Sequence, residues 1–183
     1  MRKVIVSIYT SIDGFIIGPN GEMDWVFKYA DAGSEKHSED IVDSIDLILL
    51  GRVLSDEFLP YWANDKSEFG TKIRDIPKIV FSRTLDKVGY KDVKIIKENI
   101  REEISKIKSQ PGKDIVLYGG AEIVTVFTNL GLVDEFHLFV TPVILGGGKH
   151  LFAGLNSNCS LSLMATNKYD SGTVLLIYKP KII

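Results

Sequence analysis

Three turns along the chain carry the residues best suited to bind phosphate. They are Gly51-Arg52, Ser82-Arg83 and Gly119-Gly120, and each follows a short apolar run, at residues 47–50, 78–81 and 115–118. Adjacent glycines let the backbone approach a ligand closely, because no Cβ stands in the way. Arginine can make a bidentate, charge-assisted contact with phosphate, and Ser82 with Arg83 offers a hydroxyl and a guanidinium to a ribose 2′-phosphate.

The Gly119-Gly120 turn opens an amphipathic helix predicted over residues 121–130, beginning with Ala121 and Glu122. The N-terminus of a helix points unpaired N–H groups and the positive end of its dipole at whatever lies before it. A glycine pair that only relieves backbone strain would look the same, and a single arginine is typical of a solvated surface. Ligands in open α/β sheets, however, bind beyond the carboxyl ends of the strands. The three turns together therefore favour a phosphorylated dinucleotide.

A second group of candidate residues lies in the segment of residues 11–25, which follows the first predicted strand. The segment contains three glycines and a proline, yet it is rich in apolar side chains: Ile12, Phe15, Ile16, Ile17 and Trp25. Loops rarely expose so much apolar surface. The segment either folds back over the core or forms a lid that covers a flat ring ligand and excludes water. Asp13, Asp24 and Asp31 are the acids near this lid, and they are the candidate proton donors.

Composition limits the class of protein. The chain has 183 residues, 45% of them hydrophobic, which suits a single domain over residues 1–183. Its 22 Lys and Arg and 24 Asp and Glu are spread without a basic block, so we expect no nucleic-acid partner. One cysteine cannot form an intramolecular disulfide, and no apolar run is long enough to cross a membrane, which favours a cytoplasmic protein. The three histidines lack metal-ligand spacing, so no metal site is expected.

The elements that would position these residues follow from hydrophobic periodicity. Strands are predicted at residues 4–9, 47–50, 78–81, 93–96 and 115–118, and then at 135–140, 161–166 and 173–178. Helices are predicted at 34–45, after Gly51-Arg52, after Asn99, and at 121–130; Asn99 and Glu102 have capping-box spacing. Residues 170–172 form a hairpin turn between the last two strands. The expected fold is α/β, with three layers and a mixed, mostly parallel sheet that ends in an antiparallel hairpin.

Six motifs in order resemble the dihydrofolate-reductase-like family, in particular the reductase domain of bacterial riboflavin biosynthesis in a stand-alone form. They are the Ser-Ile-Asp-Gly-Phe-Ile run at 11–16, Gly51-Arg52, residues 78–85, Tyr-Gly-Gly-Ala-Glu at 118–122, residues 131–135 and residues 141–152. The resemblance covers almost the whole chain. It implies a dihydrofolate-reductase-like fold that binds NADPH across the strand ends and transfers a hydride to a pteridine- or pyrimidine-like ring.

The resemblance also assigns residues to roles. It implies that Gly119-Gly120 holds the pyrophosphate and nicotinamide side, Gly51-Arg52 the phosphates, and Ser82-Arg83 the 2′-phosphate. Ala121, Glu122 and Ile17 complete the candidate cofactor site. Ile12, Phe15 and Trp25 are the candidate substrate contacts, and Asp13 matches an acid of the riboflavin-type reductases.

The chain departs from the family pattern at two positions. Leu54 stands where dihydrofolate reductases usually have threonine, so Ser55 would have to supply that hydroxyl. Phe15 replaces the basic residue that riboflavin-type reductases carry after the Asp-Gly pair, and the zinc-deaminase signature is missing, so the ribityl-phosphate substrate is doubtful.

The sequence therefore predicts an NADPH-dependent reductase of a heterocyclic small molecule. The alternative is a non-catalytic nucleotide- or pterin-binding protein that keeps the fold. A homodimer is also expected, because the predicted helices all precede Gly131 and cannot cover both faces of the C-terminal strands.

Overall fold

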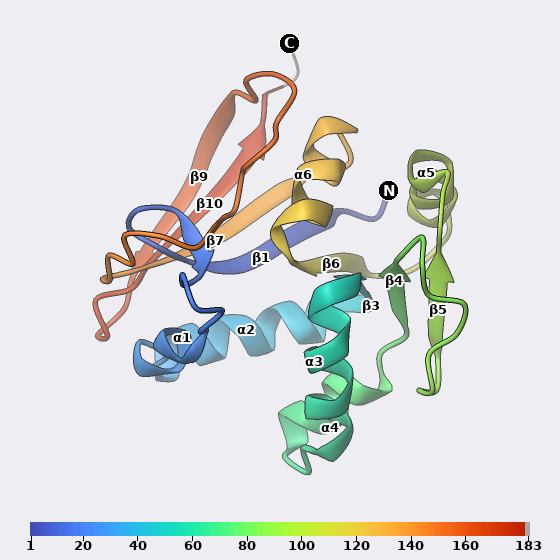
Figure 1. The fold of residues 1–183 in the computed structure, drawn as a ribbon, viewed down its shortest axis with the longest axis horizontal. Helices are drawn as coiled ribbons and strands as arrows, with labels where there is room; N and C mark the ends of the chain where they lie inside the picture. The colour runs from blue at the N-terminus through green and yellow to red at the C-terminus, as the bar shows by residue number, and fades with distance from the viewer. Residues whose placement is uncertain (182–183) are drawn as a thin grey trace.

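The computed structural model describes residues 1–181. Within this range, ten strands alternate with six helices (Figure 1). The strands are β1 (Val4–Ser11), β2 (Phe15–Ile17), β3 (Ile45–Gly51), β4 (Lys78–Phe81), β5 (Val93–Ile96), β6 (Asp114–Gly119), β7 (Glu135–Thr141), β8 (Lys149–His150), β9 (Leu161–Lys168) and β10 (Val174–Pro180). The helices are α1 (Asp24–Lys28), α2 (Ala32–Ser44), α3 (Arg52–Asn64), α4 (Glu68–Asp75), α5 (Ile100–Ser109) and α6 (Ala121–Asn129).

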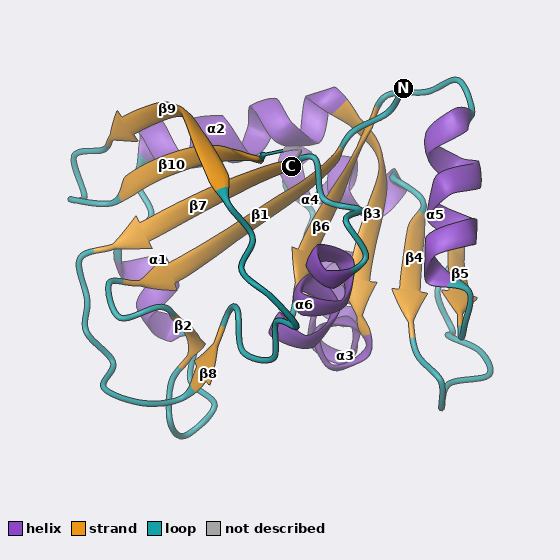
Figure 2. Ribbon diagram, turned by 90° about the horizontal axis from the view of Figure 1, so that it is seen from above, coloured by secondary structure: helices purple, strands orange, loops and turns teal. Residues whose placement is uncertain are grey.

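Eight of the described strands form one sheet in the order β5-β4-β3-β6-β1-β7-β10-β9 (Figure 2). The pairs from β5 through β7 are parallel, and β10 pairs antiparallel with both β7 and β9. The predicted mixed sheet with a C-terminal antiparallel hairpin is therefore confirmed. β2 and β8 form a separate two-stranded sheet that the sequence did not predict.

Two apolar cores on opposite faces of the sheet give the three layers. One core packs α5 and α6 against the sheet through Ile104, Val124 and Phe127, and the other packs α2, α3 and α4 through Ile41, Leu59 and Ile73. Central strands are consequently buried on both faces: Ile48, Leu49 and Leu50 of β3 are fully buried. Figure 1 shows α2 and α3 on one side of the sheet and α6 on the other.

One local prediction is wrong. Asn99 begins α5 in a left-handed conformation, at φ 56°, and its side chain makes no capping hydrogen bond, so the predicted capping box does not form. The helix after Gly51 contains Pro60 and runs to Asn64. No helix among residues 1–181 combines the length and apolar character needed to span a membrane.

Candidate functional site

The glycine turns after β3 and β6 lie against each other at one edge of the sheet. Leu50 pairs with Gly119, and Gly51 pairs with Phe81 on the next strand, so the three turns sit at the carboxyl ends of neighbouring strands. A Cβ placed on Gly51 would lie 3.2 Å from the Gly120 nitrogen and 3.3 Å from the Gly119 oxygen. A side chain here would therefore push the two turns apart. Gly120 itself faces open space, where an added Cβ would meet no atom within 4 Å.

The two helices that begin at these turns have no side-chain cap. α3 starts after Gly51 and α6 after Gly120, and a glycine has no side chain that could accept a hydrogen bond from the first-turn N–H groups. In contrast, Asp31 caps α2 and Ser67 caps α4. Two neighbouring helix N-termini with free donors form a site for anions, because both the N–H groups and the helix dipoles attract negative charge.

The two candidate arginines are exposed but differ in their surroundings. Arg52 pairs with Asp56 one turn along α3, at 3.3 Å. Arg83 makes no ion pair with any residue of the described chain, and Ser82 shapes the turn that presents it: the Ser82 hydroxyl accepts hydrogen bonds from the N–H groups of Thr84 and Leu85. Arg83 is therefore the cation at this edge that is free to meet a ligand.

Ser55 does not supply the hydroxyl that the family pattern called for. It is buried, and its Oγ donates to the Arg52 carbonyl at 2.6 Å, inside its own helix. The phosphate contact expected of a threonine near this position is therefore not replaced by Ser55.

The segment of residues 11–25, the candidate lid, is linked to the first turn of α6 through the small sheet of β2 and β8. Phe15 pairs with His150, whose ring stacks on it at 3.9 Å, and Ile17 pairs with Lys149. Lys149 in turn donates to the Glu122 carboxylate in the first turn of α6, at 2.8 Å. The candidate cofactor residues Ile17 and Glu122 are thus brought together by a residue that the sequence did not single out. The signal was the Gly-Gly-Gly-Lys run, whose last glycine, Gly148, lies against the Ile17 carbonyl.

Two of the three candidate acids are engaged by backbone N–H groups. The pKa of Asp13 is lowered to about 2 by the Ser11 hydroxyl and by the N–H groups of Gly146 and Leu145. The pKa of Asp31 is lowered to about 2 by the N–H groups of Ser34 and Ser171. Both carboxylates are ionised at neutral pH, which suits positioning of the backbone better than donation of a proton. Asp24 is exposed on α1 and pairs with Lys28 at 3.5 Å.

The candidate substrate residues fall into different environments. Ile12 is 61% exposed at the end of β1, where its N–H donates to the Val143 carbonyl. Ile144, which follows Val143 in the chain, is 73% exposed. Trp25 is only 4% exposed in α1, which corresponds to packing into the core and not to a mobile ring over a ligand.

A buried polar chain on the α2 face of the sheet escaped the sequence reasoning. His37 of α2 lies 3.1 Å from His137 of β7, from Nε2 to Nδ1, and the Nε2 of His137 lies 3.1 Å from Glu135. Lys3 completes it, 3.0 Å from Glu135. The sequence signal was the alternation of Glu135, His137 and Phe139, which places these side chains on one face of β7.

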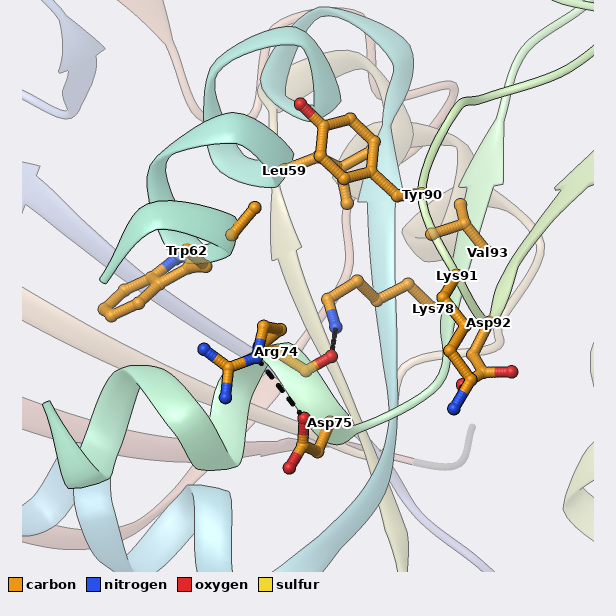
Figure 3. Close-up of a pocket in the computed structure, with 10 residues that line it drawn as sticks. Leu59, Trp62, Arg74, Asp75, Lys78, Tyr90, Lys91, Asp92 and Val93 are labelled. Carbon is orange, nitrogen blue, oxygen red and sulfur yellow. Dashed lines mark hydrogen bonds and ion pairs between the residues drawn. The ribbon is translucent and has the colours of Figure 1, made fainter. Parts of the chain in front are cut away.

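A cavity of about 280 Å³ lies at the opposite end of β4 from the candidate site, and Figure 3 shows its lining. Lys78 forms its floor, and its ammonium donates to the carbonyls of Ile73, Arg74 and Ile76 at the end of α4. Burial lowers the pKa of Lys78 to about 8. All three donors are used within the fold, so Lys78 acts as a buried helix cap and offers nothing to a ligand.

The sheet order and the paired glycine turns define a protein of the dihydrofolate-reductase-like fold. The RibD C-terminal domain family matches residues 2–175, and the chain belongs to that family. It is 40% identical to "Uncharacterized protein YyaP" of Bacillus subtilis (strain 168), over 97% of this chain and 94% of that protein.

Solved structures agree on the fold. One from Shewanella sp. PV-4, a protein provisionally assigned to riboflavin biosynthesis, covers 99% of this chain and is itself covered completely, with a TM-score of 0.82 and 24% identity. Dihydrofolate reductase from Enterococcus faecalis, complexed with NADP(H), covers 98% of this chain and is 97% covered, with a TM-score of 0.65 and 13% identity. The resemblance inferred from sequence is confirmed, and the family and fold support a reductase.

Proposed function

We propose that this protein is an NADPH-dependent reductase that transfers a hydride to a pteridine- or pyrimidine-like ring. The observation that carries the proposal is the pair of uncapped helix N-termini, at Gly51 and Gly120, which lie side by side at the carboxyl edge of the sheet. A dinucleotide has two linked phosphates, which match two adjacent sets of free N–H donors. The NADP(H) complex of the similarly folded reductase supports the choice of cofactor.

The residues present fit such a cofactor. NADPH supplies a hydride when it is bound. Gly51, Gly119 and Gly120 leave room for close approach, the first-turn N–H groups of α3 and α6 donate to phosphate, and Arg83 offers a free guanidinium to the 2′-phosphate. The small sheet of β2 and β8 belongs to the segment that follows β1, and its proposed role is to exclude water from the reacting ring.

A non-catalytic nucleotide- or pterin-binding protein is the second candidate. The state of the acids favours it, because Asp13 and Asp31 are both held ionised by hydrogen bonds and are poor proton donors at neutral pH. The two candidates differ in turnover. A panel of pteridines and pyrimidines, monitored by the absorbance of the reduced nicotinamide, separates them.

The cofactor is tested by titrating the protein with NADPH and with NADH. Because Arg83 meets only the 2′-phosphate, NADPH should bind about 10- to 100-fold more tightly, as expected for a charge-assisted contact of about 1.5–3 kcal/mol. Arg83→Ala should remove most of this preference and leave the NADH affinity nearly unchanged. Arg101→Ala, at an exposed arginine in the first turn of α5, is the matched control and should keep the preference. Equal affinity of the native protein for both nucleotides would rule out this role for Arg83.

We extend the proposal to the setting of the protein. A single exposed cysteine, Cys159, suits a reducing cytoplasm. A homodimer through the C-terminal strands is proposed on the exposure of Leu163 and Met164, which are 53% and 54% exposed on β9.

A further inference from the structure

Lys149 occupies an unusual position between the lid and the candidate cofactor site. Its backbone is held by the lid: it pairs with Ile17, the preceding Gly148 lies against the Ile17 carbonyl, and the N–H of Leu151 donates to the Gly14 carbonyl at 3.1 Å. Its side chain reaches across to α6, where the ammonium donates to Glu122. Lys149 is thus the charged link from the lid to the helix that begins at Gly120.

The ion pair lies toward the N-terminus of α6. Glu122 is the second residue of this helix, and helical side chains lean toward the N-terminal end. An ammonium bound to Glu122 therefore stays close to the first-turn N–H groups, where a phosphate is expected. The Glu122 side chain is 83% exposed and that of Lys149 is 40% exposed, so their pairing is weak enough to exchange.

Charge makes the two partners unequal toward a phosphate. The Glu122 carboxylate repels an anion at the N-terminus of α6, whereas the Lys149 ammonium attracts it. When an anion binds, the Lys149 ammonium gains a second hydrogen-bond acceptor, and its interaction with the Glu122 carboxylate weakens. A carboxylate in the first turn of an anion-binding helix is thereby tolerated, because a lysine neutralises it when the site is empty of phosphate.

We infer that Lys149 is a phosphate-binding residue of the cofactor site, and that Glu122 is the counter-ion that it leaves when phosphate binds at the N-terminus of α6. The inference rests on the proposed function, because it takes the anion to be the pyrophosphate of a dinucleotide. The inference also assigns a role to β8: because Lys149 is part of this strand, its contact with phosphate would draw β8 toward the cofactor.

The test is a titration with NADPH of four single variants and the native protein. Lys149→Gln should weaken binding by about two- to tenfold, and Glu122→Gln should tighten it by about two- to fivefold. Lys149→Arg should stay near the native affinity, because it keeps the charge. Lys94→Gln removes a lysine from a comparable exposed pair, with Glu103 at 3.1 Å, and should bind as the native protein does. Added salt should weaken NADPH binding less in Lys149→Gln than in the native protein.

The opposite signs distinguish this role from a structural one. If the pair only fastened β8 to α6, Lys149→Gln and Glu122→Gln would break the same contact and shift the affinity in the same direction. A shift in the same direction, or a Lys149→Gln affinity equal to that of Lys94→Gln, would overturn the inference and leave the proposed function standing. A native protein that binds neither NADPH nor NADH would overturn both.

Discussion

His37 and His137 are the side chains whose protonation the fold most directly opposes. Burial lowers the pKa of His137, and burial together with the neighbouring imidazole lowers the pKa of His37. Asp40 acts in the opposite direction on His37, as Glu135 does on His137, but neither carboxylate prevails. The pair is therefore expected to be neutral at pH 7, with His137 donating to Glu135 and His37 donating to His137.

This arrangement predicts a loss of stability in weak acid. In the unfolded chain both histidines take up protons near their ordinary pKa of about 6.5, whereas the folded protein binds them only at lower pH. The free energy of unfolding therefore falls as the pH drops below about 6.5. Asp13 and Asp31 do not contribute in this range, because their stabilisation is lost only as the pH falls below about 4. Urea midpoints measured from pH 7.5 to 5.5 should decrease accordingly.

The variant His37→Gln isolates the effect of the pair. It removes one of the two imidazoles whose pKa the fold lowers, so the decrease in the urea midpoint should become smaller. A native midpoint that does not change between pH 7.5 and 5.5, or a His37→Gln variant with the native slope, would contradict the neutral pair.

Asp13 and Asp31 show what cannot be predicted from the sequence at the scale of single residues. Asp13 and Asp31 were predicted as candidate proton donors from their proximity to the lid, a role that stays a prediction. Ser11 and Ser34 are local partners of these carboxylates, but Gly146 and Ser171 lie more than a hundred residues further along the chain. The distant hydrogen bonds, which complete the binding of each carboxylate, cannot be inferred from local pattern.

At the scale of elements, Gly148 decides whether the small sheet of β2 and β8 can form. A Cβ on this residue would lie 1.9 Å from the Ile17 carbonyl oxygen, and its φ of +122° is strained for any other residue. Gly148→Ala should therefore separate β8 from β2. The two-stranded pairing is much weaker than the main sheet, so the lid should open while the core stays folded.

Limited proteolysis measures this opening, because Lys149 beside Gly148 is a site for trypsin. Cleavage after Lys149 should be at least about tenfold faster in Gly148→Ala than in the native protein. Gly146→Ala is the matched control: its φ is also positive, at +69°, but an added Cβ meets no atom within 4 Å. If trypsin cleaves the two variants at equal rates, the strained positive φ, and not the contact with Ile17, is what opens the lid.

Elements were predictable where their periodicity was long. The buried runs at β3, β4 and β6 and the apolar face of α6 were read correctly, because each depends on its own sequence. β2 and β8 have three and two residues, too few to show any period, and they exist only because Gly148 lets distant segments meet. The glycine turns could be placed from the sequence because they follow directly from the strands before them. Their role in binding a cofactor stays a prediction.

The antiparallel end of the sheet carries exposed apolar side chains. β9 is the edge strand at this end, and no helix follows Asn129 in the described part of the chain (Figure 2). Leu163 and Met164 of β9 are about half exposed, whereas Phe136 of β7 and Leu175 of β10 are fully buried. Apolar side chains and the unpaired backbone of an edge strand together favour association with another chain.

A second copy of this chain is the simplest partner, because a two-fold contact uses the same apolar surface twice. Light scattering at micromolar concentration should give the mass of a dimer. Leu163→Lys should give a monomer, since the two-fold would bring two buried ammonium groups close together. Val53→Lys changes a comparably exposed residue, 59% exposed on α3, and should remain dimeric. If both variants are dimers, the interface does not include β9. If the native protein is a monomer, the exposed face of the hairpin needs no partner.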